Sequence, residues 1–141
     1  MKRLKKASKM AVLVLGLAGA FLLAGCAGKG APQKTNCDAK ITWEVVKEAE
    51  ITQFDCAMGT HEGSPSMIFT VGVKNVSDKP QRFRLNIFLE DMDKGSGSLL
   101  PVKGKPPAIQ PGKTESAKIP FMETAKASKK ILVVVKTISI E

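Results

Sequence analysis

The side chains best suited to chemistry lie close together near the middle of the chain. Cys56, Met58 and His61 offer a thiol, a thioether and an imidazole within a short stretch. These soft donors are the set that binds Cu(I) and related ions. A copper or small-ligand site at these three residues is therefore one hypothesis for this protein, and it requires Cys56 to be a free thiol.

The other cysteines suggest a different use for Cys56. Cys26 belongs to the N-terminal segment described below, which leaves Cys37 and Cys56 as a pair in a chain that we expect to be exported. Two remaining cysteines in an oxidising compartment indicate one disulfide bond. Closing a loop of this size contributes on the order of 3 kcal/mol to stability in the chain-entropy model. Two free thiols or a metal site are the alternatives.

The sequence contains no constellation that is typical of an enzyme. His61 is the single histidine, and the nucleophile motif G-x-S-x-G does not occur. Residues 90–95 read EDMDKG and space their carboxylates like a calcium loop, but Gly97 and Val102 stand where an EF-hand loop needs ligands. We interpret this stretch as a β-turn. The favoured interpretation is a protein that is not an enzyme and holds neither a metal nor a cofactor.

The N-terminus carries the strongest pattern in the chain. A basic start, MKRLKK, is followed by an apolar run over residues 10–24. The run is shorter than the roughly 20 residues that span a bilayer, and the arrangement is typical of a secretory signal peptide. It ends in Leu23-Ala24-Gly25-Cys26, which resembles the lipobox of bacterial lipoproteins. The resemblance implies cleavage before Cys26 and acylation of its thiol. An ordinary signal peptide or an uncleaved anchor is the alternative.

A lipoprotein assignment predicts the cell envelope as the location. Two or three acyl chains on Cys26 give stable attachment, so the membrane is the first expected partner. By resemblance to Gram-negative sorting, Ala27 in the next position favours the outer membrane, with the protein facing the periplasm. Loss of residues 1–25 removes five basic residues and no acidic ones, so the net charge falls from +9 to about +4. This modest charge does not indicate a nucleic-acid partner.

The pattern divides the chain into three parts. Residues 1–25 are the predicted signal peptide, residues 26–36 a lipidated tether, and residues 37–141 a single folded domain. The tether is small and polar, with the sequence AGKGAPQKTN after Cys26. We expect it to be flexible and to hold the domain within about 35 Å of the bilayer.

Alternation of apolar and polar residues predicts strands in the folded domain. The clearest strand is at residues 81–90, where Phe83, Leu85, Ile87 and Leu89 share one face. Residues 131–140 are apolar on both faces, which predicts a central strand. Further strands are expected at residues 40–46, 51–56, 67–74, 99–102 and 113–121, with a helix as the alternative over residues 45–53. Loops are expected at residues 57–65, 91–98 and 103–112.

Turn signals follow the predicted strands at short spacing. They read VGVKNVS at residues 71–77, LEDMDKG at residues 89–95 and IQPGK at residues 109–113. In this pattern the chain resembles small extracytoplasmic immunoglobulin-like lipoprotein domains, such as the FxLYD-type domains, most of which lack a defined biochemical role. The resemblance implies an all-β fold, an immunoglobulin-like antiparallel β-sandwich of about six or seven strands. The chain has no tyrosine, so the family's aromatic positions are filled differently here.

Together these patterns favour a lipid-anchored cell-envelope domain with a binding or structural role. We expect its loops or a free sheet edge to bind an envelope protein, and strand addition is the natural mode. The surfaces considered are the loops at residues 59–65 and 95–111 and the strand around Phe88, which stands among polar residues. Within the second loop, KGKPP at residues 103–107 would suit an acidic partner.

Overall fold

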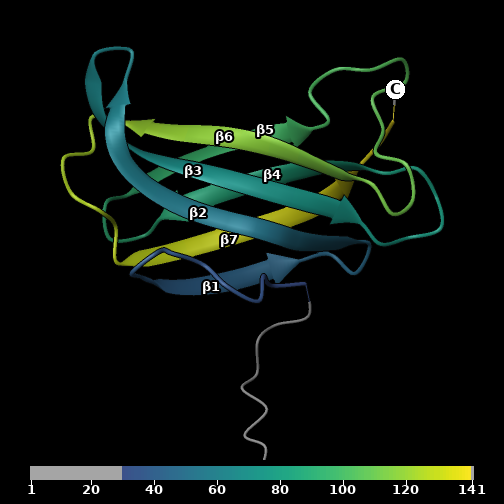
Figure 1. The fold of residues 1–141 in the computed structure, drawn as a ribbon, viewed down its shortest axis with the longest axis horizontal. Coiled ribbons are helices and arrows are strands. Elements are labelled where there is room, and N and C mark those ends of the chain that lie inside the picture. Colours follow the sequence, from purple (N-terminus) through teal and green to yellow (C-terminus); the bar gives the residue numbers. More distant parts are fainter. Residues whose placement is uncertain (1–29, 141) are drawn as a thin grey trace, which may run out of the picture.

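The computed structural model describes residues 30–140 (Figure 1). The predicted signal peptide and the predicted acylation site at Cys26 lie outside these residues. All regular secondary structure within residues 30–140 is β-strand. This part of the chain contains no helix that is long and apolar enough to cross a membrane.

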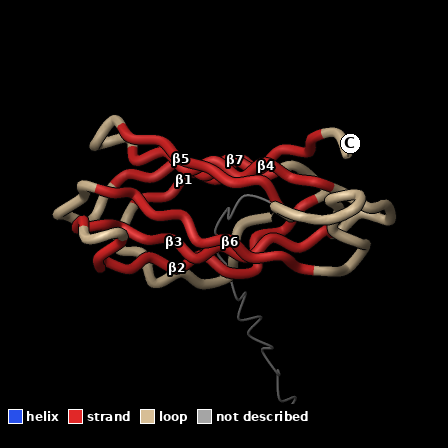
Figure 2. The backbone as a smooth tube through the Cα atoms, turned by 90° about the horizontal axis from the view of Figure 1, so that it is seen from above, coloured by secondary structure: helices blue, strands red, loops and turns tan. Residues whose placement is uncertain are grey.

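Seven strands form two sheets that pack face to face (Figure 2). One sheet has the order β1-β7-β4-β5 and the other has the order β2-β3-β6. The strands are β1 (Lys40–Val45), β2 (Ala49–His61), β3 (Ser64–Asn75), β4 (Arg82–Leu89), β5 (Lys94–Leu100), β6 (Thr114–Met122) and β7 (Lys130–Ile138). The prediction of an all-β sandwich with six or seven strands is confirmed. The sheets contain four and three strands, as in an immunoglobulin constant-type sandwich, but the strand order β1-β7-β4-β5 and β2-β3-β6 differs from that type.

β7 lies in the middle of the four-stranded sheet, between β1 and β4. Its inward side chains are buried, and Val134 on its outer face is only 7% exposed. The prediction of a central strand is therefore confirmed. β1 runs parallel to β7, with Ile41 opposite Ile131, whereas the other pairings are antiparallel. This parallel pair departs from the expected antiparallel arrangement because β1 and β7 start from the same end of the sandwich.

The faces predicted from alternation form the core between the two sheets. On β4 the residues Phe83, Leu85, Ile87 and Leu89 are completely buried, as the sequence predicts. The inward residues of β7 lie beside them in the same sheet, and those of β3 face them from the opposite sheet. The hydrophobic effect, at about 25 cal/mol per Å² of apolar surface buried, is thus the main stabilising contribution of these strands.

Four aromatic rings form a row through the core. It runs from Trp43 on β1 through Phe54 on β2 and Phe69 on β3 to Phe121 on β6, with centroid separations of 5.0, 5.4 and 5.5 Å. Contacts between tilted or perpendicular rings contribute about 0.5–1.5 kcal/mol each beyond burial. Because β1 belongs to one sheet and the other three strands to the second, the row ties the sheets together.

β2 is longer than the sequence predicts. It continues to His61, so the expected loop at residues 57–65 is a hairpin and the alternative helix over residues 45–53 is not formed. Only Glu62 and Gly63 join β2 to β3, and both have positive φ, 49° and 77°. Positive φ at both positions is the geometry of a type I′ turn. The prediction of a loop at residues 57–65 was wrong for a physical reason. Beyond Cys56 the strand projects past the core, so its side chains need not alternate between apolar and polar.

β5 also begins earlier than predicted, at Lys94, where the sequence indicates a loop. Glycine and serine give this strand almost no apolar alternation, and its order comes from pairing with β4. Phe88 lies opposite Gly95, and a Cβ atom on Gly95 would stand only 2.9 Å from the Phe88 ring. A glycine is therefore required where this aromatic ring covers the neighbouring strand.

Part of the predicted tether is held against the edge of β2. The Ile51 N–H donates to the Gly30 carbonyl at 2.8 Å, and the Thr35 hydroxyl donates to the Phe54 carbonyl at 2.6 Å. Residues 30–36 thus differ from the flexible linker that the sequence indicates, because an edge strand offers unpaired backbone groups that a passing segment can satisfy.

Candidate binding site

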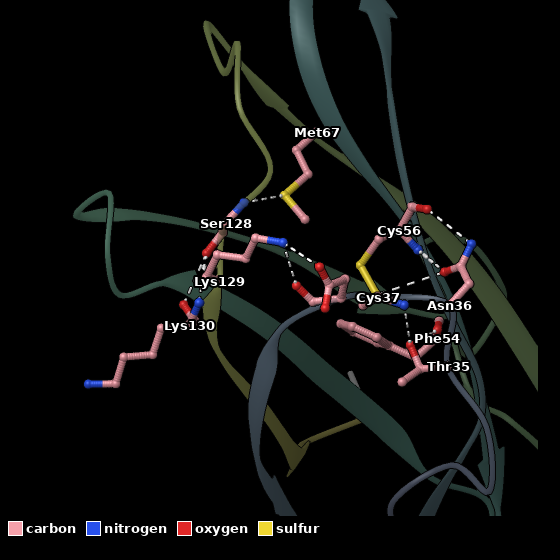
Figure 3. Close-up of a disulfide and its surroundings, with 10 residues drawn as sticks. Thr35, Asn36, Cys37, Phe54, Cys56, Met67, Ser128, Lys129 and Lys130 are labelled. Atoms are coloured by element: carbon pink, nitrogen blue, oxygen red, sulfur yellow. Dashed lines mark hydrogen bonds and ion pairs between the residues drawn. A yellow bond between two sulfur atoms is a disulfide. The ribbon is translucent and has the colours of Figure 1, made fainter.

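Cys37 and Cys56 form a disulfide bond, with their Cα atoms 5.1 Å apart (Figure 3). Asn36 flanks it and makes two hydrogen bonds with the backbone of Cys56. The Cys56 N–H donates to Asn36 Oδ1 at 2.7 Å, and Asn36 Nδ2 donates to the Cys56 carbonyl at 3.1 Å. The predicted pairing is confirmed, and it joins the segment before β1 to the edge strand of the opposite sheet.

The soft donors around Cys56 do not come together as a metal site in this disulfide form. The Cys56 sulfur is bonded to Cys37 and offers no thiolate. Met58 is 45% exposed on the projecting part of β2. His61 is the last residue of β2, not a loop residue, and its Nε2 lies 3.9 Å from Glu62 Oε1. Within residues 30–140, no group of three or more His, Cys, Asp or Glu side chains is placed to hold a metal ion.

The four edge strands are β1 and β5 in one sheet and β2 and β6 in the other. On an edge strand, every second residue turns its N–H and C=O away from the sheet. On β2 these outward groups include those of Phe54 and Cys56, and residues 35 and 36 satisfy them. The N-terminal segment therefore protects the part of the β2 edge from Ile51 to Cys56 from pairing with another chain.

The β6 edge is protected by sequence. The Asn75 N–H donates to the Lys113 carbonyl, so alternation turns the backbone groups of Lys118, Pro120 and Met122 toward the free side. Pro120 has no N–H to offer there, which is where an edge strand tolerates proline. The carbonyl of Met122 accepts a hydrogen bond from the Lys94 ammonium at 2.8 Å. This protection covers the end of the edge at residues 120–122, whereas Thr114, Ser116 and Lys118 also face the free side and have no backbone partner within residues 30–140.

The β5 edge has no such protection. The Glu90 N–H donates to the Lys130 carbonyl on β7, so alternation along β4 turns Ile87 toward β5 and hence Ser96 toward β4. The backbone groups of Gly95, Gly97 and Leu99 then point to the free side. Within residues 30–140 no hydrogen bond from another segment reaches these three N–H groups. The edge also carries no proline and only one charge, at Lys94.

An exposed apolar patch adjoins this edge on the outer face of the four-stranded sheet. Phe88 is 40% exposed there, and Leu132 lies directly opposite it on β7. The sequence left open whether Phe88 packs under a loop or forms a contact patch, and the structure places it in a patch. A shallow depression runs beside the ring, lined by Phe88, Leu89, Glu90, Asp93, Lys94, Gly95 and Leu132.

Asp91, in the β4–β5 turn, has a structural role. Asp91 accepts hydrogen bonds from the Ser128 hydroxyl and, at 2.8 Å, from the Lys129 N–H. These bonds hold the pKa of Asp91 below its ordinary value. Asp38 is likewise held at a lowered pKa by the Lys129 ammonium, which is bonded to it. Asp91 thus fastens the β6–β7 loop to the turn, as expected of a turn rather than a calcium loop.

The surfaces predicted from the sequence therefore do not all belong to one site. Phe88 and Gly95 are neighbours and form one site with the β5 edge. The β2–β3 hairpin and the loop at residues 101–113 lie at opposite ends of the sandwich and do not join that site (Figure 1). Sequence reasoning missed the β5 edge itself. The one signal for it was the pair of glycines at residues 95 and 97, of which Gly95 lies opposite Phe88 on the neighbouring strand.

Fold and site define the described part of this chain, residues 30–140, as an all-β sandwich whose β5 edge carries unpaired backbone N–H groups. Its sequence matches no family model and no curated protein, and no solved structure matches its fold.

Proposed function

We propose that this protein is a lipid-anchored cell-envelope domain that binds an extended segment of a protein partner at the β5 edge. The observation that carries the proposal is the row of backbone N–H groups at Gly95, Gly97 and Leu99 that have no partner within residues 30–140. An added strand gains main-chain hydrogen bonds at such an edge, while adjoining pockets select side chains. The lipobox resemblance at Cys26 supports the membrane anchor.

The surroundings of the edge suit this mode of binding. The two glycines leave the edge uncrowded, and the exposed face of Phe88 is ready to receive an apolar side chain of the incoming strand. Leu132 on β7 extends the apolar surface on the far side of the ring. A partner strand with an apolar residue at alternate positions would fill the depression beside Phe88.

The β1 edge is the competing position for an added strand. It lies on the side of the sandwich where residues 30–39 run (Figure 1) and where the disulfide joins the sheets. A partner would therefore meet the N-terminal segment there, whereas the β5 edge is on the opposite side of the four-stranded sheet. This asymmetry favours β5.

Cross-linking in intact cells tests the partner. The protein is expressed with its own signal, cross-linked in the membrane, purified and analysed for covalently attached proteins. We expect a defined partner with the natural chain and its loss with Leu99→Pro, because proline removes one outward N–H. Leu99→Ala keeps that N–H and should retain the partner. Ser116→Pro, on the β6 edge of the other sheet, is the matched control.

Two results would count against the proposal. An empty cross-linking experiment with the natural chain would contradict partner binding. A partner that survives Leu99→Pro but is lost with Ser116→Pro would move the binding site to the other sheet. The mass of the purified protein tests the anchor separately, since cleavage before Cys26 and acylation change it in a calculable way.

A further inference from the structure

The chain enters the sandwich near the connection between β1 and β2. Gly30 lies against Val45 at the end of β1, and its carbonyl accepts the Ile51 N–H at the start of β2. Gly30 is the fourth residue after Cys26. If Cys26 carries the lipid, as the proposed function holds, Gly30 stays within about 14 Å of the anchor, since each residue spans at most about 3.5 Å. The same distance limit keeps this region near the bilayer.

Three loops and the end of β7 share this end of the molecule (Figure 1). The Val76 N–H donates to the Glu48 carbonyl at 2.9 Å, which joins the β3–β4 loop to the β1–β2 loop. The Gly112 N–H donates to the Asn75 carbonyl at 2.8 Å, which joins the β5–β6 loop to the end of β3. We call this surface, made of residues 46–50, 74–82, 101–115 and 136–140, the lysine-rich end.

Charge is unevenly distributed along the sandwich. The lysine-rich end carries twice as many basic as acidic side chains. The basic ones are Lys47, Lys74, Lys79, Arg82, Lys103, Lys105, Lys113 and Lys136, and the acidic ones are Glu48, Glu50, Asp78 and Glu115. The opposite end mixes acidic residues of the β4–β5 turn with lysines that are bonded to carboxylates, such as Lys129 and Lys130. The excess of positive charge therefore faces the side on which the chain enters.

Exposed apolar side chains accompany the lysines. Val102 is 65% exposed at the tip of the β5–β6 loop, Val76 is 44% exposed beside Glu48, and Ile140 is 37% exposed beyond β7. Loops that present aliphatic tips among lysines suit the boundary between anionic head groups and acyl chains, where both kinds of side chain are stabilised.

We propose that the lysine-rich end is a second membrane contact, which lies on anionic phospholipid head groups while the acyl chains hold the protein to the bilayer. This inference rests on the proposed lipid anchor. It commits to a lipid surface because the short connection to Cys26 brings this end close to the bilayer and because its charge is complementary to anionic head groups. The domain is thereby oriented, with the β2–β3 hairpin pointing away from the membrane.

Lysine accessibility on vesicles tests the orientation. The acylated protein is reconstituted into vesicles of phosphatidylcholine alone or with about one-third phosphatidylglycerol, and an impermeant amine reagent labels its lysines before mass spectrometry. We expect labelling of Lys79, Lys103 and Lys105 to fall at least threefold in the anionic vesicles, relative to Lys118 and Lys126. High salt should restore the labelling of Lys79, Lys103 and Lys105, because salt screens surface charges. Equal labelling in both vesicles would overturn the proposal.

Charge-reversed variants distinguish a contact at the lysine-rich end from attraction by net charge. Lys79→Glu, Lys103→Glu and Lys105→Glu combined change only exposed loop residues and should abolish the protection of Lys113. The matched control, Lys40→Glu, Lys118→Glu and Lys126→Glu, changes the net charge equally and should leave that protection intact. If the protection were lost equally in both triple variants, attraction by net charge alone would explain it. That result would contradict a membrane contact specific to the lysine-rich end.

The lipid anchor and the second membrane contact are tested by separate measurements. An intact mass without acyl groups would contradict the lipid anchor, whatever the vesicles show. The same unacylated protein is then mixed with the two kinds of vesicle and floated. Flotation with anionic vesicles alone, lost in the Lys79, Lys103 and Lys105 variant, would still support the second contact, and no flotation would overturn it.

Discussion

At the scale of single residues, the Cys37–Cys56 bond changes what the middle of the sequence can do. The thiol that a copper site would need is bonded to a second sulfur, and Asn36 fixes the backbone of Cys56 beside it. Cys56, on which the copper hypothesis depended, thus has a structural role. The bond joins the segment before β1 to β2, so it links the two sheets on the side where the chain enters.

Removal of this bond should destabilise the domain. We expect the Cys37→Ser/Cys56→Ser double variant to lower the free energy of unfolding by about 3 kcal/mol, because the unfolded chain regains the freedom of the closed loop. Urea denaturation followed by Trp43 fluorescence measures it. Reduction of the natural chain with dithiothreitol is the control and should give a similar loss. Equal stability of the reduced and oxidised chains would contradict this prediction.

Asp91 should make stability depend on acid pH. Its pKa is lowered in the folded state by the Ser128 hydroxyl and the Lys129 N–H, so its stabilising contribution is present above the ordinary value of 3.8 and is lost as the pH falls through the lower folded pKa. We expect Asp91→Asn to lower the urea midpoint at pH 7, and the difference from the natural chain to shrink toward pH 3.

Asp93→Asn is the matched control for Asp91. Asp93 is an exposed residue of the same turn with φ of 54°, a conformation that asparagine also adopts. Its side chain makes no hydrogen bond within residues 30–140, so this substitution should leave the midpoint unchanged at both pH values. A difference for Asp91→Asn that stays constant between pH 7 and pH 3 would show that the carboxylate charge is not responsible.

At the scale of elements, the strand that we propose as the binding edge is the one whose sequence looks least like a strand. β5 reads KGSGSLL, and its inward and outward faces are distinguished by pairing with β4 rather than by its own side chains. A strand of this kind is visible only once its neighbour is known, because glycine and serine carry no alternation of hydropathy. By contrast, β4 and β7 bury regular rows of large apolar residues and could be placed from sequence to within about two residues.

The two sides of β5 should respond differently to proline. The Ser96 N–H points toward β4, so Ser96→Pro removes a bond of the sheet and should lower the free energy of unfolding by about 1–3 kcal/mol. The Leu99 N–H points to the free side, and Leu99→Pro should cost less than about 1 kcal/mol. Thermal unfolding of the two variants measures the contrast. The reverse order would show that the β5 edge has been assigned to the wrong residues.

At the scale of the whole molecule, the sequence predicted the sandwich and its number of strands but not how they are ordered. Strand order depends on pairings between residues far apart in the chain, such as Ile41 with Ile131, and alternation reports only which face of a strand is buried. The same limit hid the proposed binding site. Phe88 and the two glycines were each visible in the sequence, but their meeting at an unprotected edge follows from the topology.

The aromatic row predicts where the fold is most sensitive. Phe69 is fully buried between Phe54 and Phe121, so Phe69→Ala should lower the free energy of unfolding by about 3–5 kcal/mol. The adjacent Ile68, on the outer face of β3, is the matched control, and Ile68→Ala should cost about 1 kcal/mol. Urea denaturation of both variants makes the comparison. Similar losses for the two would contradict a core centred on Phe69.

The bonds that hold residues 30–37 to β2 also determine how the molecule would carry mechanical load. A pull between a membrane anchor and a partner strand on β5 reaches the domain at Gly30 and passes through the disulfide directly into β2. The closed loop between Cys37 and Cys56 cannot be drawn out, which removes about 60 Å from the extension that unfolding under force would otherwise release. For the proposed lipid-anchored protein, the covalent link would thus make the domain a short, stiff connection between the anchor and the partner strand.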